Sequence, residues 1–241
     1  MTEKKSAAGI SLGKALVANE APKLVRPQRL DRTEFPDPAS GQGGPPATIE
    51  NVACLLERHG IQVRYNAISK QTEISIPDLE GTGDNYSNNA MTHIGSLAAR
   101  HGMATGSIPA IVETIADRNP YNPAADWIRG EPWDGDDRLD AICATLVTVE
   151  DFPLDLKRTL IVKWLLSCVA AAIMFRGFYT RGVLTLQGPQ SIGKTSWCRS
   201  LIPVDGLRDL ALKLDHHLDG NNKDSIIGAI THWIVEIGEL D

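Results

Sequence analysis

An apolar run followed at once by a glycine-rich loop constrains the fold of this chain more than any other feature. The run Val183–Gln187 reads Val-Leu-Thr-Leu-Gln, and the loop that follows it, Gly188–Thr195, reads Gly-Pro-Gln-Ser-Ile-Gly-Lys-Thr. The pattern G-x-x-x-x-G-K-[ST] is typical of a phosphate-binding loop between a strand and a helix. Its glycines allow a tight turn in which backbone N–H groups point inward. We therefore expect an α/β fold in this part of the chain.

The residues of this loop have distinct predicted roles. Lys194 is expected to place its ammonium group on the β- and γ-phosphates of ATP, and Thr195 to offer its hydroxyl to Mg²⁺. The helix that begins near Lys194 adds the positive end of its dipole. A chance match in an ordinary loop is the alternative, which the flanking strand and helix patterns disfavour. The predicted nucleotide-binding residues are Gly188, Pro189, Gln190, Ser191, Ile192, Gly193, Lys194, Thr195 and Ser196.

A second candidate motif, Trp233–Asp241, places carboxylates directly after an apolar strand, about 40 residues beyond the glycine-rich loop. A P-loop nucleotidase needs such a strand beside the P-loop strand. Its first acid holds Mg²⁺ through water, and a second carboxylate orients the attacking water. We assign the first role to Glu236, together with Thr195, and the second to Glu239, with Asp241 a weaker candidate. A surface strand with charged ends is the alternative.

Cysteine and histidine spacing does not indicate a metal centre. The four cysteines show no Cys-x-x-Cys pairing, which fits a reducing cytoplasm. His216 and His217 are adjacent and therefore face different sides of any helix or strand. Asp215 or Asp219 would have to join one of them, so we expect no metal site there. The cysteines are Cys54, Cys143, Cys168 and Cys198.

Charge and hydropathy exclude two further classes of protein. The net charge of −6 argues against a protein that coats nucleic acid with its whole surface, although it leaves room for a local basic groove. The longest apolar segment, Trp164–Phe175, is too short to span a bilayer and predicts a buried helix. The N-terminus carries no signal-peptide pattern. We expect a cytoplasmic protein without a membrane role.

Composition divides the chain into four predicted segments. Residues 1–47 are rich in Pro, Gly, Ala and charge, which predicts a disordered tail or linker. Residues 48–118 predict a small α/β accessory module. Residues 119–181 predict a helical collar, which begins at the chain break Asn-Pro-Tyr-Asn-Pro. Residues 182–241 predict the core that carries the glycine-rich loop.

Local patterns predict the individual elements. Thr48 is the expected N-cap of a helix that Gly60 ends. Trp127 and Trp133 are expected to pack at a domain junction near a turn at 134–135. Alternating residues predict a hairpin from strands at 61–66 and 72–76. The other predicted helices cover 86–102, 108–118, 137–149, 154–176 and 223–230, and the other predicted strands cover 182–187 and 233–237.

Four segments, in their order along the chain, resemble the virulence-associated protein E family. They are Trp133–Asp140, the glycine-rich loop, the stretch 214–225 and the closing Trp233–Asp241. The resemblance covers roughly residues 120–241, and the upstream module resembles the linker that precedes this part in such proteins. Members are encoded by phages and genomic islands and are similar to superfamily 3 helicases.

The resemblance implies a P-loop NTPase core of the AAA+-like, superfamily 3 helicase type. It implies a motor that uses ATP and Mg²⁺, forms a hexameric homo-oligomeric ring and acts on single-stranded DNA during replication of a phage or mobile element. Lys194 and Thr195 would hold ATP and Mg²⁺, and Glu236 and Glu239 would be the catalytic acids.

One departure from the family pattern lowers the ATPase activity that we expect. A superfamily 3 core continues beyond the acidic strand with a sensor residue, a DNA-contacting hairpin and an arginine finger, which is worth about 10³–10⁵ in turnover. We therefore expect a core that is incomplete at its C-terminus and hydrolyses ATP weakly. A truncated remnant that binds nucleotide or a partner protein is the first alternative. A small-molecule kinase is the second, disfavoured because no Arg-rich lid follows the acidic strand.

Overall fold

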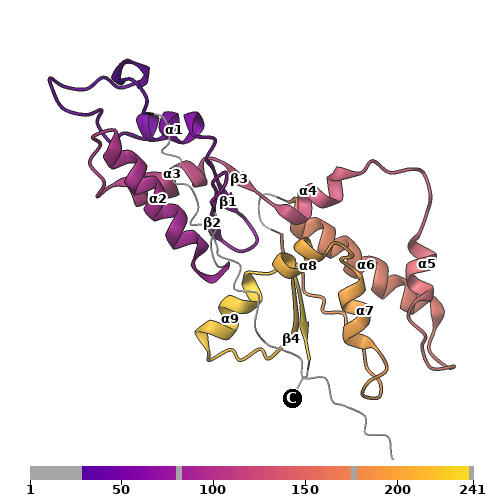
Figure 1. Cartoon of the computed structure of the whole chain (residues 1–241). Helices are drawn as coiled ribbons and strands as arrows, with labels where there is room; N and C mark the ends of the chain where they lie inside the picture. Colours follow the sequence, from indigo (N-terminus) through magenta and orange to yellow (C-terminus); the bar gives the residue numbers. More distant parts are fainter. Residues whose placement is uncertain (1–28, 80–82, 175–177, 239–241) are drawn as a thin grey trace, which may run out of the picture.

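The computed structural model describes residues 29–79, 83–174 and 178–238. These residues form two packed units, each with its own hydrophobic core (Figure 1). Helices and strands occur in both units, so the chain is of mixed α/β type. No helix in the described ranges is long and apolar enough to cross a membrane.

Three α-helices, two short 3-10 helices and a three-stranded sheet make up the described part of the first unit. The sheet has the order β2-β1-β3, with β1 antiparallel to β2 and parallel to β3. Val63 and Ile74 of the hairpin pack into one core with the helices. The elements are η1 (Arg32–Glu34), α1 (Ile49–Arg58), β1 (Gln62–Asn66), β2 (Gln71–Ser75), η2 (Gly83–Asn85), α2 (Tyr86–Arg100), α3 (Ile108–Asp117) and β3 (Pro120–Tyr121).

Local sequence signals account for most of this unit. The Thr48 side chain caps α1 by accepting a hydrogen bond from Asn51 N, as predicted. Val52 and Leu55 keep helical spacing and are fully buried. Gly60 follows the helix with a φ of 65°, a conformation that glycine adopts without strain. The predicted helices and hairpin are therefore confirmed.

Residues 29–47 differ from the predicted disordered tail. Phe35 is only 5% exposed and lies in the first core. The Asn51 amide fixes the segment, because it accepts from Asp37 N and donates to the carbonyls of Asp37 and Pro46. Composition indicated a loop, but one aromatic anchor and one buried amide hold this loop on the helices. Residues 1–28 of the predicted tail lie outside the described residues.

The second unit contains six helices and a two-stranded parallel sheet within the described ranges. Figure 1 shows α7 on one side of β4 and α9 on the other. Leu212 and Ile234 of the two strands pack against small residues of the preceding helices, including Ala124 and Ala172. The elements are α4 (Pro123–Gly130), α5 (Leu139–Ala144), α6 (Leu154–Ile173), α7 (Lys194–Ser200), α8 (Asp205–Ala211), β4 (Leu212–His216), α9 (Lys223–Ile230) and β5 (Ile234–Ile237).

The helices predicted as a collar belong to this second core. Ala172 of α6 is buried there, and the Trp233 indole N–H donates to Cys168 O of the same helix at 2.8 Å. Helix α4, which the sequence analysis did not predict, begins at Pro123 after the N-cap Asn122. The expected separation of collar and core is therefore not seen: α6 forms one wall of the core that β4 and β5 also build.

Among the described residues, Ile68 and Asn122 make contacts where the two units meet. Ile68, at the turn between β1 and β2, is only 7% exposed because it packs into the core of the second unit. Asn122 caps α4 by accepting from Ala124 N and Ala125 N, and its amide donates to Ala172 O at 2.9 Å. The predicted chain break at 119–123 is thus a short strand, β3, followed directly by a capped helix.

Candidate functional site

The glycine-rich loop Gly188–Thr195 turns sharply before helix α7. Gly193 has a φ of 97° and Ser191 a φ of 65°, so two of its residues adopt left-handed backbone. Gly193 is the N-cap of α7, and its carbonyl accepts the first helical hydrogen bond from Trp197 N at 2.9 Å. Any side chain at Gly193 would be strained, which explains why the pattern has glycine there. The predicted helix after the loop is confirmed.

Lys194 folds back over its own loop. Its ammonium group donates to Gly188 O at 2.8 Å and to Pro189 O at 2.9 Å. Both acceptors are uncharged carbonyls, and these hydrogen bonds are exposed to solvent. An anionic acceptor would add the Coulombic attraction between opposite charges to the hydrogen bond. An anion at the loop would therefore compete well for this ammonium group.

Glu236 lies at the centre of the site and uses both carboxylate oxygens. Thr195 Oγ1 donates to Glu236 Oε1 at 2.9 Å, and Asp215 N donates to Glu236 Oε2 at 2.6 Å. Thr195 is in the first turn of α7, Glu236 is in β5 and Asp215 is in β4, so three elements meet at one side chain. The structure thus brings together two predicted site residues and adds Asp215, which the sequence indicated only as a candidate partner of the histidines.

A cavity of about 500 Å³ lies next to these residues. Its wall contains apolar side chains of α6, α7 and β5 and the extended segment that leads into the glycine-rich loop. The rings of Trp164 and Trp197 lie 6.2 Å apart, and the Trp197 indole donates to Thr145 Oγ1 at 2.8 Å. The lining residues are Trp164, Val183–Gly188, Lys194, Trp197, Cys198 and Ile234–Gly238.

The predicted strand at 182–187 is not formed, and this prediction is wrong. Val183 is 76% exposed, and among the described residues the segment belongs to neither sheet. The strand β5 pairs with β4 instead, and the cavity lies between β5 and the segment. A strand needs a hydrogen-bonded neighbour, and an apolar pattern alone does not provide one. The expectation that the acidic strand lies beside the P-loop strand is therefore not met either.

His216 and His217 face opposite environments, as their spacing predicted. His216 is buried and its Nε2 lies 3.0 Å from Ser225 O, whereas His217 is exposed. Within the described ranges, no three side chains of His, Cys, Asp or Glu cluster in a way that would hold a metal ion. His216 therefore joins β4 to α9 through packing and a hydrogen bond.

Cys198 and Cys168 are half-buried thiols near this site. Burial is the main cause that raises the pKa of each thiol to about 11, and the nearby charge of Glu236 adds to the effect at Cys198. At neutral pH both thiols are therefore protonated and weakly nucleophilic. Packing, rather than reactivity, is the role that the structure gives to these cysteines.

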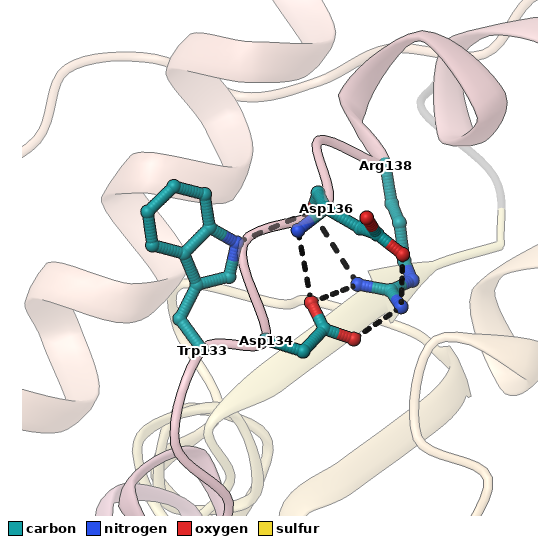
Figure 2. A network of polar contacts seen from close by, with 4 residues as sticks. All are labelled: Trp133, Asp134, Asp136 and Arg138. Carbon is teal, nitrogen blue, oxygen red and sulfur yellow. Dashed lines mark hydrogen bonds and ion pairs between the residues drawn. The ribbon is translucent and has the colours of Figure 1, made fainter.

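The loop before α5 is organised by one arginine (Figure 2). Arg138 donates to both oxygens of Asp134, at 2.8 and 2.5 Å, and lies 3.4 Å from Asp136 Oδ2. The paired guanidinium holds the pKa of the Asp134 carboxyl well below its ordinary value. The Trp133 indole donates to Asp136 O at 3.2 Å, and Gly135 completes the turn with a φ of 95°.

Trp127 and Trp133 were both expected to pack at a domain junction, and only Trp127 packs against a distant part of the chain. Trp127 packs edge-to-face against Trp233, with ring centroids 6.3 Å apart. Trp133 is 79% exposed and does not pack at a junction, because its indole N–H is used within its own loop. This loop is tied to the helices at its end, where Arg158 of α6 pairs with Asp140 of α5 at 2.7 Å.

Two of the predicted site residues cannot be compared with the structure. Glu239 and Asp241 lie outside the described residues, whereas the whole glycine-rich loop and Glu236 lie inside them. Sequence reasoning missed Trp164, Trp197 and the backbone of Asp215. The two tryptophans carry no motif. The only sequence signal for Asp215 was its position, one residue before the end of a strand that contains apolar residues.

Comparison with known proteins covers the part of the chain that contains this site. A search of curated proteins found no match. Residues 128–241 match the family model of the virulence-associated protein E-like domain, and this match supports the resemblance drawn from the motifs of that region.

Proposed function

We propose that the second unit binds ATP with Mg²⁺ at the glycine-rich loop and is the ATPase portion of a helicase-type replication protein of a phage or mobile element. The observation that carries the proposal is the hydrogen bond of 2.9 Å between Thr195 and Glu236. The two side chains lie far apart in the sequence and were assigned to the same ion by independent motifs. Their contact supports the proposal, because a shared Mg²⁺ site needs both side-chain oxygens near one ion.

The positive charge of Lys194 would bind the phosphates of the nucleotide. Its two hydrogen bonds to the Gly188 and Pro189 carbonyls are replaced when the ammonium group turns to the β- and γ-phosphates. The exchange is favourable because the phosphates carry negative charge, which attracts the ammonium group more strongly than a neutral carbonyl does. The left-handed residues Ser191 and Gly193 keep the loop curved, so its backbone N–H groups are free to donate to the same phosphates.

Thr195 and Glu236 fit the preference of Mg²⁺ for oxygen ligands and retained water. When bound, the ion would neutralise charge on the β- and γ-phosphates. The Thr195 hydroxyl would turn its oxygen lone pair to the ion and release Glu236 Oε1. Glu236 Oε2 would stay on Asp215 N, and the freed oxygen would accept a hydrogen bond from ion-bound water.

DNA and a hexameric ring are the parts of the proposal that depend on the family match and the motifs that resemble the family. The setting in a phage or mobile element has the same support. Single-stranded DNA is the proposed partner, and it would raise ATP turnover if the site belongs to a motor.

A second candidate is a nucleotide-binding module without turnover. The high exposure of Val183 favours it, since the segment before the glycine-rich loop is not fixed in a sheet. Such a site would bind Mg²⁺-ATP but would hold the reacting atoms loosely. Steady-state ATP turnover with and without single-stranded DNA separates this module from the motor, and transfer of phosphate to a small acceptor would indicate the kinase alternative.

Calorimetry with Mg²⁺-ATP tests the proposed site directly. We expect the wild type to bind and Lys194→Ala to lose a few kcal/mol of affinity, because bound phosphates lose their main charge partner. Lys223→Ala is the matched control, since it removes the same charge from an exposed position at the start of α9. Equal affinity of wild type and Lys194→Ala, or no binding by the folded wild type, would overturn the proposal.

A further inference from the structure

A β-bulge interrupts the pairing of β4 with β5 at the candidate site. The register runs Leu212 to Ile234 and Lys213 to Val235, and it resumes with His216 opposite Ile237. Two residues of β4, Leu214 and Asp215, therefore lie opposite the single residue Glu236. Bulges of this kind re-aim backbone and side-chain groups and are frequent next to active sites.

Asp215 has the unusual backbone conformation in this bulge. Its φ is +50°, in the left-handed region that non-glycine residues seldom adopt and that Asp and Asn tolerate best. In a regular strand the N–H groups lie in the plane of the sheet and the side chains stand out of it. The turn at Asp215 breaks this rule, because its N–H donates to the side chain of the neighbouring strand, at Glu236 Oε2.

This hydrogen bond fixes one oxygen of a carboxylate that is otherwise mobile. A glutamate on a half-buried strand position has three rotatable side-chain bonds and several accessible rotamers. With Oε2 held at 2.6 Å by Asp215 N, Oε1 is directed at the glycine-rich loop, where it accepts from Thr195 Oγ1. The carboxylate is thus aimed at the hydroxyl before any ligand binds.

The end of β5 is shaped to accept the same bulge. A Cβ atom added to Gly238 would overlap the carboxylate of Asp215. The Asp215 side chain therefore lies against the backbone just beyond β5, and its N–H points back at Glu236. The bulge and Gly238 fit together as one arrangement around the acidic side chain.

We propose that Asp215 is a positioning residue for Mg²⁺-nucleotide binding: its left-handed backbone N–H holds Glu236 so that the second carboxylate oxygen faces Thr195. This inference rests on the proposed function, because it concerns the ion-binding half of the same site. The Asp215 carboxylate itself is not required, whereas the left-handed backbone and the N–H are.

Four substitutions at this position separate backbone from side chain. Asp215→Gly and Asp215→Asn keep the N–H and tolerate the left-handed conformation. Asp215→Pro removes the N–H and fixes φ near −65°, and Asp215→Val keeps the N–H but disfavours a positive φ. The Val variant serves if the Pro variant fails to fold, and thermal unfolding of each variant reports whether the fold is kept.

The measurement is ATP affinity by calorimetry, with Mg²⁺ and again with the ion removed by EDTA. Mg²⁺ should raise the ATP affinity of the wild type, and we expect this increase to be about 10- to 100-fold smaller in Asp215→Pro and Asp215→Val. This is the usual effect of losing a group that orients a metal ligand. Their affinity for ATP without Mg²⁺ should equal that of the wild type. Asp215→Gly and Asp215→Asn should retain the full gain.

The outcomes distinguish this inference from the proposed function. If the folded wild type fails to bind ATP in either condition, the proposed function fails and the inference with it. If the wild type shows the Mg²⁺ gain and Asp215→Val or Asp215→Pro shows it equally, only the inference fails. Loss of the gain in Asp215→Gly, with unchanged thermal stability, would also overturn it, because the side chain would then be the essential group.

Discussion

Thr195 and Glu236 are 41 positions apart in the sequence and share a hydrogen bond of 2.9 Å between the threonine hydroxyl and the glutamate carboxylate. This contact joins the start of α7 to β5. It places the last residue of the glycine-rich loop against the acidic strand.

The Thr195 hydroxyl gives the first prediction. Thr195→Val keeps the size and branching of the side chain but removes its oxygen, so we expect the gain in ATP affinity from Mg²⁺ to fall about tenfold or more. Thr195→Ser keeps the hydroxyl and should bind like the wild type. Because the Thr195 side chain is exposed, thermal stability should change little in either variant. Calorimetry with and without Mg²⁺ checks the result, and equal gains in the Val and Ser variants would contradict it.

The close approach of α9 to β4 gives a prediction about stability. A Cβ at Gly228 would lie 3.1 Å from Cε1 of His216, which is buried and held by a hydrogen bond to Ser225 O. We therefore expect Gly228→Ala to destabilise the protein by about 1–3 kcal/mol through overpacking.

Gly206→Ala is the matched control for this change. Gly206 also lies in a helix, α8, but a Cβ there meets nothing within 4 Å. This variant should be neutral or more stable by up to about 1 kcal/mol, because alanine is the better helix former. Urea unfolding of both variants measures the difference. A Gly228→Ala protein as stable as Gly206→Ala would mean that His216 moves aside without cost.

Alkaline pH should destabilise the protein through its half-buried thiols. Burial raises the pKa of Cys168 and of Cys198 to about 11, from an ordinary value of 9.0. Between these values the unfolded chain loses thiol protons that the folded chain retains, so the free energy of unfolding falls as pH rises. Below pH 9 the stabilisation is fully present.

Thermal unfolding at several pH values between 8 and about 11 measures this loss. The double variant Cys168→Ala, Cys198→Ala should lose less stability over this pH range than the wild type. The quantity compared is the change in stability with pH within each protein. A loss of packing in the alanine variant lowers its stability at every pH and does not affect this change. Identical pH dependence of the two proteins would show that these thiols do not titrate differently on folding.

Local patterns predicted the helices and the hairpin of the first unit because each signal lies within a few residues. Thr48 caps α1, and the alternation around Val63 sets the faces of β1. Long-range contacts decided the rest. Residues 29–47 are fixed by Phe35 and by the Asn51 amide, and no local rule connects those groups to a Pro- and Gly-rich segment.

The candidate site shows the same division. Motif spacing was sufficient to name Thr195 and Glu236, since both carry a chemical requirement. The pairing of β5 with β4, and the unpaired segment at 182–187, depend on which strands meet in space. The left-handed Asp215 depends on the bulge, which is a property of two strands together and is not encoded in either alone.

The junction between the two units gives the last prediction, which concerns Asn122. Its side-chain oxygen caps α4, and its amide also donates to Ala172 O at 2.9 Å. Asn222 caps α9 in the same way, by accepting from Asp224 N and Ser225 N. Replacement of either cap by alanine should cost about 1 kcal/mol. Asn122→Ala should cost about 1 kcal/mol more, since it also removes the donor to Ala172 O. Urea unfolding of the two variants compares these costs directly. Equal costs would show that the bond to α6 adds nothing to the stability of the junction.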